Sequence, residues 1–399
     1  MRFISFGECN KYLIFPLIGG LCKLILNSII YLIQYDLELD DHPFCEGINA
    51  GFGMGLAIIP YLTISKYSKN AKKKELEKHA EEVEKKKNPN LTKEKYIIIF
   101  LCSFLDFLQK ILVFIFQHNI YNNIWLFDII FLNLFDFMLN KNHLYKHHYL
   151  SGGIMLLFGI GFNAINLLNI KVNEIPLLFL SIFIEIIYSL TIVLAKNGIE
   201  YKFCSPFELT FYEGFFALFL NVVFLAISSY IPLSKNFTYL KLLSKSEYNG
   251  RKYLDHFLSY FGNMSFVEAL LFIITMLNRV FFNLFTHFTL KYFNSSHVVF
   301  ILICGEISLD WQDKSAFEIA SKAIIMIIEL FMLLIFCERL ELNFCGLDEN
   351  TKRNMEKRLR LTIYDDESCD SKEIWKGLEL SDNESRTSNQ TSNNSFLGI

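Results

Sequence analysis

PLLFLSIFIEIIYSLTIVLA, residues 176–195, is an apolar stretch that contains one charged side chain, Glu185. The hydrocarbon core of a bilayer is about 30 Å thick, and a helix rising about 1.5 Å per residue crosses it in roughly 20 residues. A helix also satisfies its own backbone hydrogen bonds in lipid. The stretch therefore predicts a transmembrane helix, and the chain is expected to be an all-α membrane protein.

Nine further apolar stretches extend this prediction to most of the chain. Hydrophobic residues make up 52% of the 399 residues, the mean hydropathy is +0.31, and 41 Phe stand against 7 Pro, which is outside the usual range of soluble proteins. The ten predicted spans are Tyr12–Ile33, Ile48–Ile64, Tyr96–Phe116, Ile120–Leu139, Leu150–Leu168, Pro176–Ala195, Leu209–Ile231, Val267–Leu290, Val298–Trp311 and Phe317–Phe336.

Charge predicts the orientation of these spans. Residues 66–95 contain eleven Lys and six Glu, and the positive-inside rule places such a loop in the cytosol. Alternation then puts both termini in the cytosol and the acidic loop 34–47 on the opposite side. The long loop 232–266 also falls on that opposite side although it is basic, because long loops cross membranes largely regardless of charge. The formal net charge of -3 gives no indication of nucleic-acid binding.

The span count divides the chain into two halves, 1–171 and 172–340. Each half has five predicted spans, and an odd number of spans makes the halves oppositely oriented, so we expect two inverted five-helix repeats. Residues 341–399 form a predicted cytosolic tail. The end of this tail, 381–399, is rich in Ser and Asn and is expected to be largely disordered.

Motifs for enzymes and metal sites are sparse. The nine cysteines form no CxxC pair, and no GxxxxGK[ST], GxSxG or HExxH pattern occurs. His143, His147 and His148 form one HxxxHH cluster, which we interpret as a solvated group beside the lipid headgroups. The sequence therefore predicts a protein that is not an enzyme and that has no cofactor or metal.

Ionisable residues inside the predicted spans are the candidates for function. A charge inside the bilayer costs about 2.5–3.5 kcal/mol on insertion scales, so such residues face partners or cavities. Asp106 and Lys110 are four residues apart and can pair, either as a structural ion pair or in a transport pathway. Arg279, Asn283 and His287 form a polar stripe, in which Arg279 could bind a carboxylate or phosphate. It could equally be held by Glu268 or Glu306.

Small residues predict close helix packing. Gly47, Gly51 and Gly55 repeat every fourth residue, and Gly152, Gly153, Gly159 and Gly161 occur in the fifth span. Small side chains let membrane helices approach closely, so we expect these glycines to lie at helix contacts.

Two stretches resemble the drug/metabolite transporter superfamily. The first is YKFCSPFELTFYEGFF, residues 201–216, where Glu213, Gly214 and Phe216 match the family's Glu-Gly-x-Phe-Gly sequence at the start of the seventh span and Ala217 replaces its last glycine. The second is FNLFTHFTLKYFNSSH, residues 282–297, which is similar to the family's eighth span and the start of its ninth. The likeness is greatest to the nucleotide-sugar-transporter-like, EamA-like solute carriers.

The resemblance implies a secondary transporter of a small organic solute, of the nucleotide-sugar or metabolite class, that works by alternating access. It would lie in an endomembrane (Golgi, ER or vacuole) as a multi-pass protein, and a homodimer is left open. The alternative is a non-transporting scaffold or receptor with the same fold. The residues expected to bind the solute are Lys23, Asp106, Lys110, Asp128, Glu213, Asn278, Arg279 and Asn283.

Overall fold

The computed structural model describes residues 4–6, 11–37, 42–67, 90–116, 128–140, 145–167, 175–232, 246–262, 264–293, 295–306, 324, 327, 328, 330–337 and 339–342. About 87% of these residues are helical. The loop 68–89, the tail beyond Leu342 and the side chain of Glu306 lie outside the described part. The all-α class predicted from the sequence is thus confirmed for the described residues.

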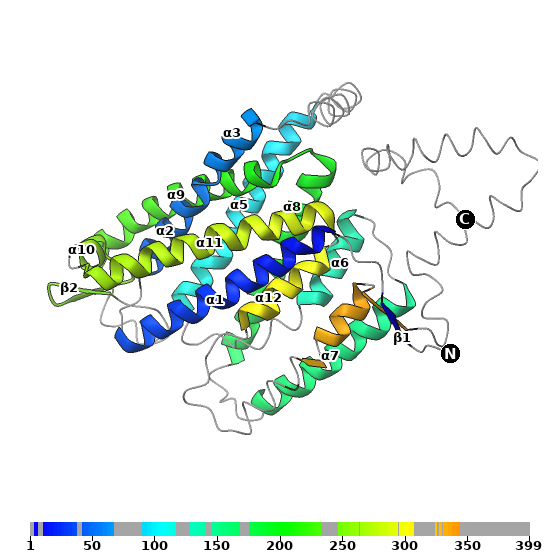
Figure 1. Ribbon diagram of the computed structural model, residues 1–399. Helices are drawn as coiled ribbons and strands as arrows, with labels where there is room; N and C mark the ends of the chain where they lie inside the picture. Colours follow the sequence, from blue (N-terminus) through cyan, green and yellow to red (C-terminus); the bar gives the residue numbers. More distant parts are fainter. Residues whose placement is uncertain are drawn as a thin grey trace, which may run out of the picture.

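Most of the helices pack side by side in one bundle, and α7 lies at its edge (Figure 1). Their bounds are α1 Ile14–Leu37, α2 Pro43–Gly55, α3 Ile58–Tyr67, α5 Leu91–Phe116, α6 Asp128–Asn140, α7 Lys146–Leu167, α8 Ile175–Tyr201, α9 Pro206–Tyr230, α10 Phe257–Phe261, α11 Phe266–Tyr292 and α12 Val298–Glu306. Helix α2 packs along α9, α1 lies against α11 and α12, and α8 lies against α5 and α6.

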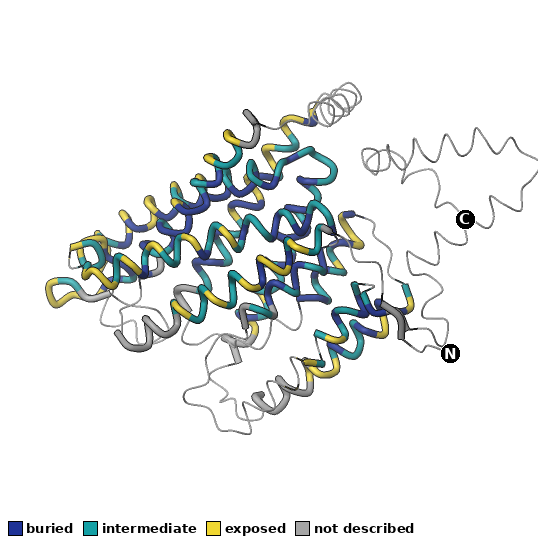
Figure 2. Tube along the Cα trace, in the orientation of Figure 1, coloured by how far each residue is buried: buried dark blue, intermediate teal, exposed yellow. Residues whose placement is uncertain are grey.

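Four helices of the described residues are long and apolar enough to cross a membrane. They cover Leu91–Val113, Phe179–Tyr201, Pro206–Tyr230 and Phe266–Tyr292, and they coincide with four of the predicted spans. Their outward faces are apolar: Phe215, Phe219 and Val222 of α9 are exposed, as are Leu270 and Ile273 of α11. Figure 2 shows exposed residues along the outside of the bundle and buried residues between the helices. Apolar side chains on the outside suit a surface that faces lipid.

The predicted span Ile48–Ile64 is not one continuous helix, so this prediction was wrong in detail. Helix α2 ends at Gly55, two turn residues follow, and α3 starts at Ile58. The break follows Gly51, Gly53 and Gly55, which weaken a helix because glycine loses the most backbone entropy on folding. Pro60 lies in the first turn of α3, where its missing N–H costs little.

Two small antiparallel strand pairs complete the described structure. Strand β1 Ile4–Phe6 pairs with β4 Leu340–Leu342, which brings the two chain segments that flank the predicted spans together. Strand β2 Ser246–Tyr248 pairs with β3 Arg251–Tyr253 in the loop between α9 and α11. The turn that joins them uses Asn249 and Gly250, both with positive φ.

Glycines explain the tight contact of α2 with α9. A Cβ on Gly214 would lie 2.5 Å from the Gly55 nitrogen and 2.8 Å from the Gly51 carbonyl oxygen, and a Cβ on Gly47 would collide with the Asn221 side chain. The close packing predicted for the second span is thus confirmed for Gly47 and Gly51. Among the described residues it is not found for Gly55 or for Gly153 of α7, where nothing lies within 4 Å of an added Cβ.

The larger core lies where α5, α6, α8 and α9 meet. Its buried side chains include Ile99, Leu132, Val193, Leu209 and Leu290. A smaller cluster of Phe44, Cys45, Phe107, Ile111 and Leu225 lies between α2, α5 and α9. Polar side chains in the bundle are therefore positioned by tightly packed apolar neighbours.

Candidate functional site

Several groups of polar side chains occur in the described bundle, and three of them are named here. We call them the central polar layer (Lys23, Asp106, Lys110, Asp128, Glu185, Tyr188, Asn278 and Arg279), the Asp136 network (Asp136, Asn140, Asn197 and Ser295) and the Asp255 cluster (His42, Cys45 and Asp255). The first group contains six of the eight residues that the sequence predicts to bind solute. The third was not predicted at all.

The central polar layer brings together charges from α1, α5, α6, α8 and α11. Lys110 Nζ lies 2.5 Å from Asp106 Oδ2, so the predicted pair on one face of α5 is confirmed. Arg279 interacts electrostatically with Asp106 and Glu46. Glu268, one of its two expected partners, instead bonds the backbone of Ser265 and caps α11. The charges of α5 and α11 are thus coupled across the bundle.

The second part of the layer surrounds Asp128, at the start of α6. Its buried carboxylate is bonded by Glu185 and by Ser189, whose hydroxyl donates to Asp128 Oδ1 at 3.4 Å. Lys23 of α1 interacts with the same carboxylate, and its Nζ lies 4.3 Å from the centre of the Phe282 ring. The layer therefore contains both cations and carboxylates, with Asp128 at the start of α6 and Lys23 and Glu185 near the middle of α1 and α8.

Two buried polar atoms of the layer have hydrogen-bonding capacity to spare. Asn278 Nδ2 donates to Asn27 Oδ1 at 2.7 Å, but its Oδ1 has no hydrogen-bond partner among the described residues. The buried hydroxyl of Tyr188 has none either within the described chain, and it lies in the field of Asp106, Asp128 and Glu185. Buried polar groups are usually bonded, so such atoms call for a specific explanation.

The two remaining predicted residues lie elsewhere in the bundle. Asn283 is bonded to Met54 Sδ, beside the break between α2 and α3. The buried Glu213 carboxylate lies 3.5 Å from His287 Nε2, and His287 Nδ1 bonds the Thr210 hydroxyl at 2.8 Å. The structure thus joins α9 and α11 through Glu213 and does not place Glu213 in the central polar layer.

The Asp136 network lies toward the C-terminal end of α6. Asp136 Oδ1 accepts from Asn140 at 2.6 Å, and Oδ2 accepts from the Ser295 hydroxyl at 2.7 Å. Asn197 of α8 donates to Asn140 Oδ1 at 2.9 Å. These bonds join α6, α8 and the 3-10 helix Ser295–His297. Each polar group named here has a hydrogen-bond partner within the network.

The predicted solvated histidine cluster is only partly described, and its described members are not solvated. His147 and His148 are buried, their ring centroids lie 4.0 Å apart, and His148 packs against Phe336. The Tyr145 N–H donates to His148 Nδ1 at 3.0 Å. The expectation of a group exposed beside the headgroups was therefore wrong for these two residues. His143 lies outside the described residues.

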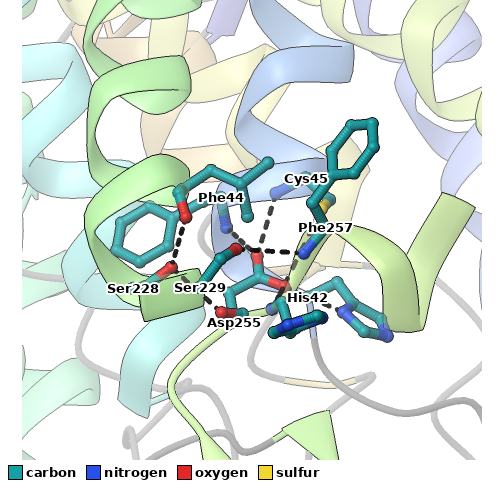
Figure 3. Close-up of polar contacts among 9 residues, drawn as sticks. His42, Phe44, Cys45, Ser228, Ser229, Asp255 and Phe257 are labelled. Carbon is teal, nitrogen blue, oxygen red and sulfur yellow. Dashed lines mark hydrogen bonds and ion pairs between the residues drawn. The ribbon is translucent and has the colours of Figure 1, made fainter. Parts of the chain in front are cut away.

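The Asp255 cluster joins the loop after β3 to the start of α2 (Figure 3). The backbone N–H groups of Phe44 and Cys45 donate to Asp255 Oδ2 at 2.7 and 3.0 Å. His42, at the N-cap position of α2, makes no side-chain cap bond of its own. The first N–H groups of a helix have no partner within the helix, so Asp255 supplies the missing cap.

Ring and thiol side chains surround the same carboxylate. His42 Nδ1 lies 2.9 Å and Cys45 Sγ 3.7 Å from Asp255 Oδ1, and the His256 N–H donates to this oxygen at 2.7 Å. The Ser228 hydroxyl of α9 donates to the Asp255 carbonyl oxygen at 3.0 Å. Asp255 itself is 0% exposed. Burial and the adjacent Asp255 carboxylate raise the pKa of the Cys45 thiol, so Cys45 is protonated at neutral pH in this environment.

The sequence holds a signal for this cluster that we missed. The segment HPFC, residues 42–45, starts a helix with Pro at the first position, and the N-cap position before it holds His42 instead of Ser, Thr, Asp or Asn. Such a start needs an acceptor from another part of the chain. The sequence does not reveal which carboxylate provides it, because Asp255 is more than 200 residues away.

No protein-family model and no curated protein matches this chain.

Proposed function

We propose that the protein is a secondary transporter of a small organic solute, of the nucleotide-sugar or metabolite class, that works by alternating access between two inverted five-helix repeats. The observation that carries the proposal is the central polar layer. It gathers charged side chains from helices of both halves in the interior of a membrane-type bundle, and it includes buried polar atoms with bonding capacity to spare.

The packing of the helices supports the repeat. Exchanging the two halves maps α1 onto α8, α2 onto α9, α5 onto α11 and α6 onto α12. The contacts of α1 with α11 and α12 then correspond to those of α8 with α5 and α6, and the contact of α5 with α9 corresponds to that of α11 with α2. The α2–α9 contact maps onto itself. The contacts of α11 with α8 and α12 have no comparable counterparts between α5 and α1 or α6, but the more extensive contacts keep their partners under the exchange, as two related bundles would.

The number of crossings has independent support. Strand β1 precedes the first predicted span and strand β4 follows the last, and the two strands pair. Two segments at the same end of the bundle must be separated by an even number of crossings, which agrees with ten. The His42–Asp255 contact likewise joins the loops 34–47 and 232–266, which we place together on the non-cytosolic side of an endomembrane.

The chemistry of the layer favours a solute with an anionic group. Arg279 has a planar fork of donors that matches carboxylate and phosphate, and Lys23 adds a second cation. The carboxylates Asp128 and Glu185 and the Tyr188 hydroxyl can bond the hydroxyl or amide groups of the same solute. Such a set of groups suits a sugar phosphate or a nucleotide sugar better than an apolar ligand.

Counterflow in liposomes tests this function. Purified protein is reconstituted with unlabelled solute inside, and the uptake of labelled nucleotide sugars, nucleoside phosphates, amino acids and organic cations is followed. We expect saturable uptake of at least one anionic solute above the level of protein-free liposomes. Folded, correctly inserted protein that moves none of these solutes would overturn the proposal and favour the alternative, a scaffold or receptor that uses the same fold.

A further inference from the structure

The side chains of His42, Cys45 and Asp255 meet at one point at the end of the bundle. Their ligand-type atoms all lie within 4.8 Å of one another, and the three residues are buried. His42 and Cys45 flank the start of α2, whereas Asp255 comes from the loop between β3 and α10. Figure 3 shows the side chains of His42 and Cys45 close to the Asp255 carboxylate.

The two separations from Asp255 Oδ1 are close to those between ligand atoms in a tetrahedral zinc site. Zinc binds histidine nitrogen and carboxylate oxygen at about 2.0–2.2 Å and thiolate sulfur at about 2.3 Å, so neighbouring ligand atoms are roughly 3.3–3.6 Å apart. The separations of Asp255 Oδ1 from His42 Nδ1 and Cys45 Sγ are 2.9 and 3.7 Å. Because the three ligand atoms all lie within 4.8 Å of one another, small side-chain shifts would allow all of them to contact one ion.

The two carboxylate oxygens of Asp255 have different partners. Oδ2 accepts the two backbone N–H groups of α2 and stays fixed by them, while Oδ1 faces His42 and Cys45. The His256 N–H also donates to Oδ1, and the Ser228 hydroxyl donates to the backbone carbonyl oxygen of Asp255. Hydrogen bonds that orient a ligating carboxylate in this way are the usual support of a metal ligand.

The charges also balance. A thiolate at Cys45 and the carboxylate of Asp255 together carry two negative charges, which a divalent cation cancels in a buried place. On binding, the thiol proton leaves to solvent and the neutral imidazole carries its proton on Nε2, so that Nδ1 is free to ligate. Thiolate and imidazole select zinc over magnesium and calcium, which prefer oxygen.

We propose that His42, Cys45 and Asp255 bind one Zn²⁺, with water in the fourth position, and that the ion clamps the start of α2 to the loop after β3. The site is separate from the central polar layer and does not depend on transport. It lies where α2, α9 and the loop before α10 meet, so a bound ion would stabilise this end of the bundle.

Cobalt binding tests the proposal with a readout that requires the thiolate. The full-length protein in detergent is treated with a chelator, the chelator is removed, and Co²⁺ is added. We expect a thiolate-to-cobalt charge-transfer absorption that saturates at one ion per chain and disappears when Zn²⁺ is added. Zinc should also raise the thermal unfolding midpoint of the chelator-treated protein.

Matched cysteine variants locate the ion. Cys45→Ser should remove the absorption and weaken zinc binding by more than the roughly 10- to 100-fold that outer-shell changes cost. Cys22→Ser, which changes a half-buried thiol of α1, should leave both unchanged. His42→Gln gives a second variant that keeps the thiol and the cap from Asp255. The proposal is overturned if the wild-type protein shows no absorption with Co²⁺, or if the absorption persists in Cys45→Ser.

Discussion

The central polar layer and the Asp136 network are both buried, both built from residues of several helices, and yet bonded differently. In the Asp136 network, both carboxylate oxygens of Asp136 and the side-chain oxygen of Asn140 accept hydrogen bonds of 2.6–2.9 Å. In the central layer, Arg279 is linked to carboxylates of two other helices, and Tyr188 and Asn278 each have a buried atom with no partner among the described residues. A satisfied network holds helices together, whereas a layer with capacity to spare can bind something else.

The largest expected effect is on transport through the central layer. Arg279→Ala removes a charge-assisted contact to the solute worth about 1.5–3 kcal/mol, so counterflow should fall roughly 10- to 100-fold. Arg279→Lys should recover only part of it, because lysine has no planar fork of donors. Arg251→Ala, at an exposed position of β3, is the control and should keep wild-type flux. Equal flux from all the variants would assign Arg279 a structural role.

The next largest effect is on protein stability, through the α2–α9 contact between the two halves. Gly214→Ala places a Cβ 2.6 Å from Met54 Cβ and 2.5 Å from the Gly55 nitrogen. Overpacking of this kind costs about 1–3 kcal/mol, so the thermal midpoint in detergent should drop. Gly153→Ala meets no neighbour and should instead gain up to about 1 kcal/mol from the better helix propensity of alanine. Similar shifts in both variants would show that the close α2–α9 contact does not limit stability.

The smallest expected effect comes from replacing one asparagine in each of the two regions, the Asp136 network and the central polar layer. Asn197→Ala removes a neutral hydrogen bond of the Asp136 network, with a loss of about 0.5–1.5 kcal/mol in unfolding free energy and no change in flux per folded molecule. Asn278→Ala removes a comparable bond in the central layer. It should lower flux as well as stability. If flux responds to Asn197→Ala and not to Asn278→Ala, the roles of the two regions are reversed.

Local rules predicted the local features. The spacing of Asp106 and Lys110 predicted their pair because residues four apart share one helix face. Apolar length predicted the helices from Leu91, Phe179, Pro206 and Phe266, since the bilayer sets the same length for each. Glycine spacing predicted the α2–α9 contact but failed at Gly55 and Gly153, where no atom of the described residues lies within 4 Å of an added Cβ.

The sequence did not predict which residues far apart in the chain contact one another. It suggested Glu268 or Glu306 for Arg279, but Glu268 is used to cap its own helix, and the carboxylates that interact electrostatically with Arg279 come from α2 and α5. The Asp255 cluster was missed because its members are far apart in the chain and only the fold joins them. Which of many buried carboxylates meets a given donor depends on tertiary packing and not on local pattern.

Thiol accessibility tests the central claim, that the central polar layer lines a solute pathway, most directly. Asn278→Cys and Ser103→Cys place thiols at two buried positions of spanning helices, one in the layer and one whose native hydroxyl donates to Ile99 in its own helix. In liposomes, a charged thiol reagent should modify Asn278→Cys faster than the wild-type chain, and transported solute should slow the reaction. Ser103→Cys should react no faster than wild type. Equal rates in the two variants, or no protection of Asn278→Cys by solute, would contradict the account.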